Sequence, residues 1–499
     1  MISFSISLVN CTFFRHGRLK DGIFSIDQFF FNDKRFSNTR VAANFNYFQQ
    51  NLDHFHHQQN ITWPQRYWIN TKYYKPGGPS FLLIGGEGPA ISSWIQESEK
   101  YPKDWMKKAQ TFGAICFMLE HRYYGESHPT DNMKTENLRW LTSDQALADV
   151  ANFISYATTR YNLQGSQWIT FGGSYAGLLS GWSRLKYPHL ITGAVASSAP
   201  FQIKVNFHEY LDSAFDSIKK VNANCGSEIE NAILQMRQLL RTEYGRRELK
   251  EKLSLCKKIK QAEGKDVQNL FAVIADMFSF IVQYNQPKAT MNIRNMCEKL
   301  TDLSGGDPVT RLGVIIRWML RFTSSFCLNF RYADMIAELS DTKWSKSSIF
   351  KQRIELFVLQ IDNGNIKLAR NLVIFKQQIH FIMLSLEPMI YSQFFLDICK
   401  DTFGKQFSEA TVQTGVYEKN VRYGGKQLKK SNIILINGSV DPWHRLGLLN
   451  NPHPLSKAIF INGSSHCADM YPELTGIDPE TLIKARREIT GHIASWILQ

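Results

Sequence analysis

The feature that most constrains the fold of this chain is a glycine-rich turn at residues 171–177, which read FGGSYAG. It directly follows a short apolar run and opens a predicted helix. A chain that passes abruptly from a buried strand into a helix has room only for small residues around the tip of the turn, and it projects the tip residue from a strained backbone. The pattern therefore predicts that Ser174 is a nucleophile at a strand-to-helix turn. The alternative is an ordinary glycine-rich turn.

Short apolar runs recur along the chain and predict buried strands of a parallel sheet. A helix is expected to begin near Thr142, which has capping-box spacing to Gln145. The last helix is expected to have Asp478 as its N-cap and Pro479 in its first turn. Strands that alternate with helices indicate a sheet with helices on both faces. The predicted strands are 80–84, 114–119, 167–171, 193–196, 432–436 and 457–461.

The middle of the chain interrupts this alternation, because its pattern is mostly helical and has few strand candidates. It also contains five cysteines, Cys225, Cys256, Cys297, Cys327 and Cys399, an odd number that excludes complete pairing within the segment. We therefore expect an α/β protein with a mainly helical insertion, here called the cap. The expected divisions are an N-terminal segment at 1–44 (a degenerate signal sequence or an incorrect start), core halves at 45–201 and 401–499, and the cap at 202–400.

Two loops near the C-terminus carry partners for Ser174. Asp441 follows one late strand and His466 follows the next. In α/β-hydrolases the nucleophile, the acid and the histidine occur in this order, each after a strand. The order predicts that Asp441 orients His466, which takes the proton from Ser174. Ser174 Oγ and the Asp441 carboxylate should then lie on opposite ring nitrogens, about 2.6–3.2 Å away. Taken singly, Asp441 fits a turn residue before a proline, and His466 fits an exposed loop histidine.

Two backbone segments are candidates for stabilising an oxyanion. The N–H of Tyr175 would face the developing charge at the start of the predicted helix. The loop at 85–89, GGEGP, follows the first predicted strand, and in this fold that loop supplies a second N–H, from Gly86 or Glu87. A plain Gly/Pro turn is the alternative for this loop.

Composition excludes several functions and favours one compartment. The net charge is +14, but the basic residues are spread along the chain without a nucleic-acid motif, so no nucleic-acid partner is expected. The longest apolar stretch, 270–282, carries Asp276 and predicts a buried helix rather than a membrane span. His54, His56 and His57 lack a ligand pattern and are expected to be structural. Eight cysteines and a glycosylation sequon at Asn60 favour the secretory pathway.

The chain resembles the family that contains lysosomal Pro-X carboxypeptidase, dipeptidyl peptidase II and thymus-specific serine protease. The resemblance spans nearly the whole predicted core, and the segments 172–177 and 184–189 (RLKYPH) are most similar to the thymus-specific serine protease branch. The matching stretches are 50–55 (QNLDHF), 64–67 (PQRY), 85–89, 120–127 (EHRYYGES), 172–177, 197–200 (SSAP), 441–443 (DPW) and 466–469 (HCAD).

This resemblance implies a secreted or lysosomal serine peptidase with a helical cap, which acts on a peptide substrate without metal or cofactor. In the family, the Trp after Asp-Pro lines the pocket for the residue before the scissile bond, often proline. Trp443 matches that position, and Leu178 is the apolar residue one turn into the nucleophile helix. Exopeptidase action after proline or a small apolar residue is favoured over endopeptidase action. A homodimer is left open.

One stretch departs from the family. Residues 349–388 lack the aromatic, cysteine-containing segment that relatives show there, and they contain no Cys or Trp. Cys399 matches a cysteine whose family partner lies in that missing segment, so the resemblance implies that Cys399 is a free thiol in a loosened cap. Two other functions therefore stay open, a lipase or esterase with the same three residues and a non-catalytic protein with a damaged cap.

Overall fold

The computed structural model of the chain describes residues 45–56, 60–96, 102–205, 207–287, 289–323, 325–344 and 388–498. The expected N-terminal segment at 1–44 and nearly all of the atypical stretch at 349–388 lie outside these residues. The expected loosening of the cap around that stretch is therefore still a prediction.

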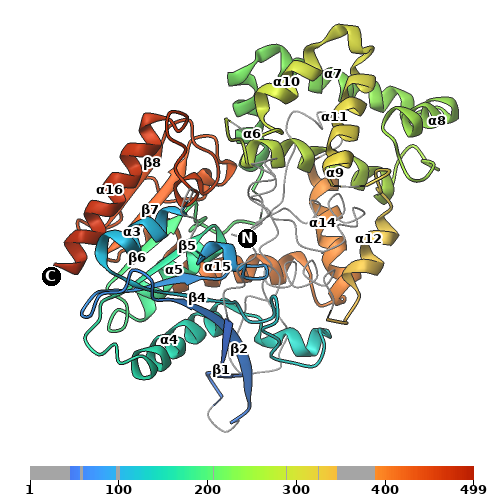
Figure 1. Cartoon of the computed structure of the whole chain (residues 1–499). Coiled ribbons are helices and arrows are strands. Elements are labelled where there is room, and N and C mark those ends of the chain that lie inside the picture. Colours follow the sequence, from blue (N-terminus) through green and yellow to red (C-terminus); the bar gives the residue numbers. More distant parts are fainter. Residues whose placement is uncertain are drawn as a thin grey trace.

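The centre of the molecule is an eight-stranded sheet with the order β1-β2-β4-β3-β5-β6-β7-β8. Six strands, β3 to β8, run parallel, whereas β2 is antiparallel to both of its neighbours. Figure 1 shows the sheet in the lower left part of the molecule. The strands are β1 (Phe45–Asn51), β2 (Thr62–Asn70), β3 (Ser80–Ile84), β4 (Ile115–Leu119), β5 (Trp168–Gly173), β6 (Gly193–Ser197), β7 (Ile433–Gly438) and β8 (Lys457–Ile461).

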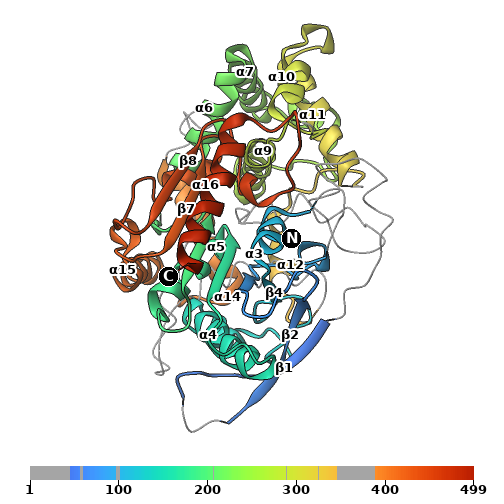
Figure 2. The same cartoon turned by 60° about the vertical axis from the view of Figure 1, so that its left-hand side comes forward.

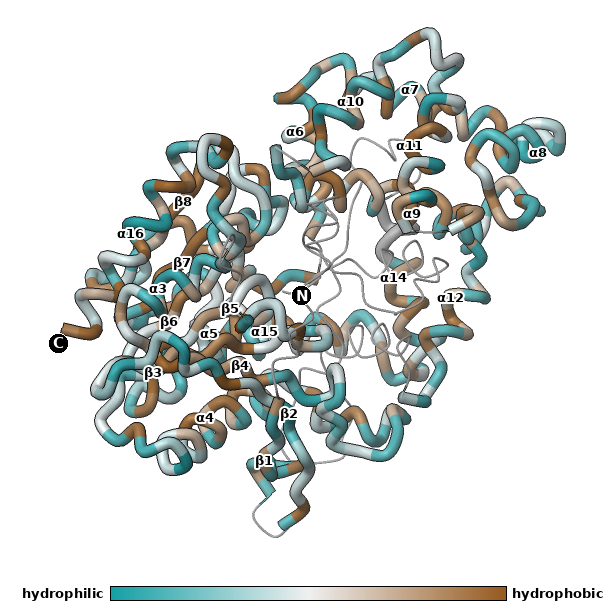
Figure 3. The backbone as a smooth tube through the Cα atoms, in the orientation of Figure 1, coloured by the Kyte–Doolittle hydropathy of each residue, from teal (hydrophilic) through white to brown (hydrophobic). Residues whose placement is uncertain are grey.

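The six parallel strands are those predicted from the sequence, within two residues at each end. Every residue of β3, β4, β5, β6 and β7 is buried, because helices cover both faces of the sheet. Figure 3 shows these strands as predominantly hydrophobic segments. The strands β1 and β2 were not predicted. Their sequences, FNYFQQN and TWPQRYWIN, mix polar with aromatic residues and give no continuous apolar run.

Helices cover the sheet on both sides, as expected. From β3 through α3 (Asp104–Phe112) the chain steps one way along the sheet, and through α4 (Ser143–Arg160) it steps back, so right-handed crossovers place α3 and α4 on opposite faces. The helix α5 (Tyr175–Lys186) packs beside α4, and α16 (Glu480–Ile497) packs beside α3 (Figure 2).

The start of α16 differs by one residue from the prediction. Its N-cap is Pro479 rather than Asp478. The Asp478 carboxylate instead accepts hydrogen bonds from the Leu474 N–H and from Arg486 Nη1. Asp478 therefore forms an ion pair with the buried Arg486 instead of capping the helix.

Between β6 and β7 lies the cap, which is helical as predicted (Figure 1). Two disulfides, Cys225–Cys297 and Cys256–Cys327, cross-link its helices and loops, and Cys399 is a buried free thiol. Its helices are α6 (Glu209–Val221), α7 (Ala223–Leu240), α8 (Glu243–Lys252), α9 (Lys265–Gln283), α10 (Ile293–Thr301), α11 (Pro308–Phe322), α12 (Tyr332–Leu339) and α14 (Pro388–Phe403). The helix α15 (Glu409–Tyr423) then leads back to the sheet.

The stretch at 270–282 forms most of α9, and all of it is buried, in line with the buried helix predicted there. Within the described part of the chain, no helix is both long and apolar enough to cross a bilayer. The molecule is thus an α/β-hydrolase core with a mainly helical insertion.

Candidate active site

Ser174 lies at a sharp turn between β5 and α5. Its φ of 57° and ψ of −124° are a strained conformation for a residue with a side chain, and the helix begins at the next residue. The Ser174 N–H donates to the Ser197 carbonyl at the end of the neighbouring strand β6, at 2.8 Å. The structure therefore shows the strand-to-helix turn that the sequence predicts.

Two glycines make this turn sterically feasible. A Cβ on Gly172 would lie 2.1 Å from the Ala176 carbonyl oxygen, and one on Gly177 would lie 2.9 Å from the Ser197 carbonyl oxygen. Both neighbours are backbone atoms that cannot move aside cheaply. The small residues around Ser174 are thus required by the close approach of β5, β6 and α5.

Asp441 and His466 meet at the ends of the next two strands. His466 Nδ1 lies 2.9 Å from Asp441 Oδ2, and both side chains are fully buried. The other carboxylate oxygen of Asp441 accepts the Trp443 N–H at 3.0 Å. A buried carboxylate on Nδ1 fixes the tautomer in which Nε2 is free to take a proton.

The Asp441 carboxylate also tunes the basicity of His466. Burial lowers the pKa of the imidazole, but the attraction of the adjacent carboxylate outweighs burial and raises the pKa well above its ordinary value. Nε2, the nitrogen expected to face Ser174 Oγ, has no hydrogen-bond partner among the described residues. The contact between Ser174 Oγ and His466 is therefore still a prediction.

The loop that carries His466 is tied to the turn that carries Ser174. Cys467, the next residue, donates its N–H to Ser198 Oγ at 2.9 Å, and its thiol lies 3.8 Å from the Ser197 carbonyl oxygen. That same carbonyl accepts the N–H of Ser174. The end of β6 thus holds both the turn that carries Ser174 and the loop that carries His466.

The predicted oxyanion donors come from adjacent strands. Tyr175 is the first residue of α5, and Gly86 and Glu87 follow β3, which pairs with β5 in parallel. The loop at 85–89 is anchored at both ends, because Gly85 N–H donates to the Leu119 carbonyl at 2.8 Å and Ala90 N–H donates to Glu120 Oε1 at 3.0 Å. Both candidate segments therefore start at the carboxyl ends of neighbouring parallel strands.

The side chain of Tyr175 is hydrogen-bonded to His121. The Nδ1 of His121 lies 2.7 Å from the Arg122 carbonyl, which can only accept, so Nδ1 carries the proton. Nε2 then accepts from the Tyr175 hydroxyl at 3.2 Å. Burial lowers the pKa of His121 to about 4, so the ring is neutral near pH 7. The segment at 120–127 thus supports the site structurally.

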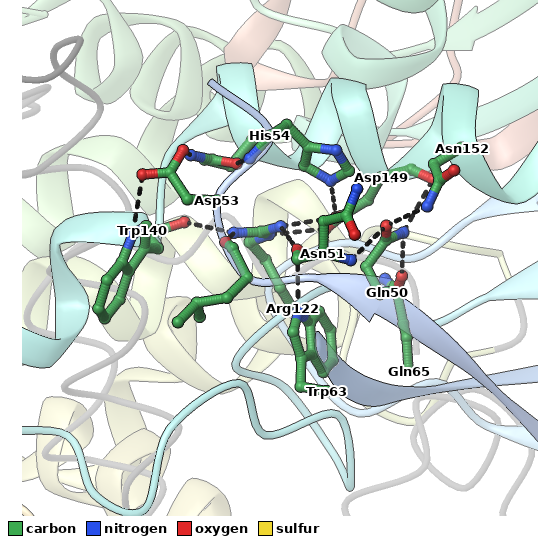
Figure 4. Close-up of polar contacts among 12 residues, drawn as sticks. Gln50, Asn51, Asp53, His54, Trp63, Gln65, Arg122, Trp140, Asp149 and Asn152 are labelled. Atoms are coloured by element: carbon green, nitrogen blue, oxygen red, sulfur yellow. Dashed lines mark hydrogen bonds and ion pairs between the residues drawn. The ribbon is translucent and has the colours of Figure 1, made fainter. Parts of the chain in front are cut away.

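Arg122 anchors that segment through a buried network, shown in Figure 4. Its guanidinium makes two hydrogen bonds of 2.6 Å to the Asp149 carboxylate, and it also donates to the carbonyls of Leu52 and Trp140. His54 completes the arrangement, with Nε2 2.7 Å from Asp149 Oδ1. His54 is therefore structural, as expected, whereas His57 lies outside the described residues.

The two residues implied for substrate binding lie on different elements. Leu178 is buried on α5, and its N–H donates to the Ser174 carbonyl at 3.0 Å. Trp443 belongs to the short helix η6 (Pro442–Arg445) and is almost fully buried. Its ring lies 5.0 Å from Tyr210 and 6.5 Å from His466, between centroids. Trp443 thus connects the histidine to the first helix of the cap.

Two residues of this region were not identified from the sequence. Asp469 accepts a hydrogen bond from Ser197 Oγ, and burial raises the pKa of its carboxyl to about 6. Gln283, at the end of α9, contacts the site from the cap. Asp469 could have been suspected from the HCAD motif at 466–469. Gln283 had no such signal, because it is one polar residue at the end of an apolar helix.

The comparisons with known proteins agree with this geometry. Residues 50–489 match the family described as serine carboxypeptidase S28. The chain is 32% identical to the thymus-specific serine protease of Mus musculus over 461 residues, 90% of this chain and 86% of that protein. It is 27% identical to the lysosomal Pro-X carboxypeptidase of Homo sapiens over 480 residues, 92% of this chain and 89% of that protein.

The fold defines the class: this is an α/β-hydrolase with a serine at the sharp turn between β5 and α5. Within that class, the chain belongs to the serine carboxypeptidase S28 family, whose members are serine-type peptidases. The family predicted from the sequence motifs is thereby confirmed.

Proposed function

We propose that this protein hydrolyses peptide bonds by acyl transfer to Ser174. Ser174 Oγ attacks the carbonyl carbon of the scissile bond while His466 Nε2 takes the hydroxyl proton. The C–N bond then breaks, and the imidazolium gives this proton to the departing amine. Water, deprotonated by His466, attacks the acyl-enzyme, and the carboxylic acid leaves as Ser174 regains its proton. The Asp441 carboxylate stabilises the imidazolium on Nδ1.

The observation that carries this proposal is the buried hydrogen bond between Asp441 and His466. These residues follow β7 and β8, and only β6 lies between β7 and the strand that leads to Ser174. The N–H of Tyr175, at the start of α5, is proposed to stabilise the oxyanion together with the N–H of Gly86 or Glu87. These groups sit at the carboxyl ends of parallel strands, where ligands bind in α/β sheets.

For substrate preference we propose cleavage after proline or a small apolar residue, with exopeptidase action favoured. Trp443, Tyr210 and Phe207 bring three aromatic rings together beside His466, with Trp443 5.7 Å from Phe207 between centroids. Flat aromatic faces suit a compact apolar ring such as that of proline. Leu178 would line the same region from α5.

We further propose that the protein works in an oxidising lumen, as a secreted or lysosomal glycoprotein. Two disulfides of the cap persist only where thiols are oxidised. Asn60 of the proposed glycosylation sequon lies two residues before β2 and is exposed, as a glycan acceptor must be.

A fluorophosphonate probe tests the proposal. The wild type should be labelled at Ser174, whereas Ser174→Ala and His466→Ala should not be labelled at a measurable rate. Wild-type protein that has not been exposed to the probe should cleave proline-containing peptides faster than p-nitrophenyl esters of fatty acids, relative to the uncatalysed rates. The reverse preference would indicate the lipase or esterase alternative. A folded wild type that takes no label would indicate the non-catalytic alternative.

A further inference from the structure

Gln283 links the cap to the loop that carries His466. It is the last residue of α9, and only 1% of its surface is exposed. Its backbone carbonyl accepts the N–H of His466 at 3.0 Å. The peptide group of the proposed base is thus held by the cap rather than by its own sheet.

The side chain of Gln283 makes three further hydrogen bonds. Its Oε1 accepts hydrogen bonds from the indole Nε1 of Trp443 at 3.0 Å and from the hydroxyl of Tyr210 at 2.7 Å. Its Nε2 donates to the Tyr284 hydroxyl at 2.8 Å. The indole N–H can only donate, so the orientation of the amide is fixed.

Three elements converge on this amide. Tyr210 comes from α6, Gln283 from α9, and Trp443 from η6, and each of the three packs against the other two. Tyr284 also contacts the imidazole of His466 edge to face, with ring centroids 6.2 Å apart. Gln283 therefore holds Trp443, the aromatic residue proposed to bind substrate, through its side chain, and the loop of the proposed base through its backbone carbonyl.

We propose that Gln283 is a positioning residue of the active site, which couples docking of the cap to the orientation of His466 and Trp443. The inference rests on the proposed acyl transfer at Ser174. It adds that the core alone does not complete the site, because the histidine loop takes one of its anchors from residue 283. Glutamine suits this role, since it offers an acceptor for two donors and a donor for Tyr284 without placing a charge in a buried site.

The test compares Gln283→Met, which keeps the size of the side chain and removes its hydrogen bonds, with Asn269→Leu. Asn269 lies on the same helix, is buried, and donates only to the Phe330 carbonyl at 2.9 Å, so its loss perturbs the cap away from the site. We expect Gln283→Met to lower kcat for a peptide substrate at least 10-fold and to slow fluorophosphonate labelling of Ser174 similarly. If the two variants have similar melting temperatures, Asn269→Leu should change kcat and the labelling rate by less than threefold.

A second variant, Gln283→Glu, separates positioning from general destabilisation. The neutral carboxylic acid can accept from Trp443 and Tyr210 and donate to Tyr284, whereas the carboxylate would add a negative charge against Tyr210, which already lies in the field of Asp276 and Asp441. Activity relative to wild type at the same pH should therefore rise as the pH falls. The ratio for Gln283→Met should stay flat. This comparison carries the test if Gln283→Met does not fold.

Wild-type kcat and labelling rate in folded Gln283→Met would overturn the proposal, and so would equal losses in Asn269→Leu. A ratio for Gln283→Glu that does not depend on pH would overturn it as well. Failure of the proposed function would look different, because the wild type itself would then take no label, or Ser174→Ala would retain it.

Discussion

The sheet and the cap are stabilised by different means. The sheet is a ladder of backbone hydrogen bonds buried on both faces, and its cysteine Cys116 is a buried free thiol. In its described residues the cap contains a single isolated β-bridge, Leu255 to Leu328, and it carries both disulfides of the described chain. Helices satisfy their own backbone groups, so nothing but side chains fixes one helix against another. Covalent links supply in the cap what the hydrogen-bond ladder supplies in the sheet.

The largest expected effect concerns the core. Ser174→Ala should reduce peptide turnover by roughly 10⁴-fold or more and abolish fluorophosphonate labelling, because no other group would accept the acyl chain. The control is Ser183→Ala in the same helix, where the hydroxyl only donates to the Ser180 carbonyl at 2.7 Å. Labelling that persists in Ser174→Ala would remove Ser174 from its proposed role.

The next effect concerns the cap. Replacing Cys225 and Cys297 together by serine should lower the free energy of unfolding by about 2–5 kcal/mol, since the bridge closes a long loop between residues 72 positions apart. Denaturant melts followed by circular dichroism would measure the loss. The matched change in the sheet is Cys116→Ser, which breaks no bridge. If both variants melted alike, the disulfide would not be what distinguishes the two regions.

A third prediction uses two carboxyl groups with opposite pKa shifts. Burial raises the pKa of Asp469 in the core to about 6. The ordinary value of the unfolded chain is about 4, so the folded state binds this proton more tightly, and it loses stability as the pH rises from about 4 to 6. The loss amounts to roughly 3 kcal/mol. In Asp469→Asn this part of the pH dependence of the free energy of unfolding should flatten.

Asp307 in the cap has the opposite sign. Burial raises its pKa, but the Lys252 ammonium group outweighs burial and lowers the pKa to about 2. Its contribution to stability is therefore present above about pH 4 and lost as the pH falls towards 2. Asp307→Asn should flatten only this acidic limb. A pair of variants that flatten the same pH range would contradict the assignment of the two shifts.

The last prediction concerns the number of free thiols and involves no substitution. Alkylation under denaturing, non-reducing conditions, followed by peptide mapping, should modify Cys116, Cys399 and Cys467 and leave the four bridged cysteines of the cap unmodified. Cys399 found quantitatively in a disulfide would contradict both the structure and the family-based expectation.

Most of the core could be predicted from the sequence, because strands buried on both faces must be continuously apolar. The strands β1 and β2 escaped this rule. In β1, Gln50 is fully buried and donates to Gln65 Oε1 on β2 at 2.9 Å, so buried polar pairs took the place of an apolar run. Ser174, Asp441 and His466 could be located in the predicted fold because each of them follows one of these apolar strands.

The contribution of the cap to the site could not be predicted in this way. Gln283 meets Trp443 across 160 positions of sequence, and nothing in the periodicity of an apolar helix specifies what its last residue will contact. Such a contact depends on how the cap docks, which is a property of the packed whole. Local patterns therefore predicted where Ser174, Asp441 and His466 lie in the fold, but not the contacts that the cap makes with them.

The insertion of the cap between β6 and β7 has a consequence for biosynthesis. Asn432 at the start of β7 donates to the Thr192 carbonyl beside β6 across 240 positions of sequence, so these neighbours leave the ribosome about 10–50 s apart at ordinary rates of translation. During that interval β6 is an open edge that invites association with other chains. The nascent first half of the core also lacks Asp441 and His466, the proposed acid and base, until the last two strands are synthesised. The order of these segments in the chain would thereby delay the proposed activity until synthesis is nearly complete.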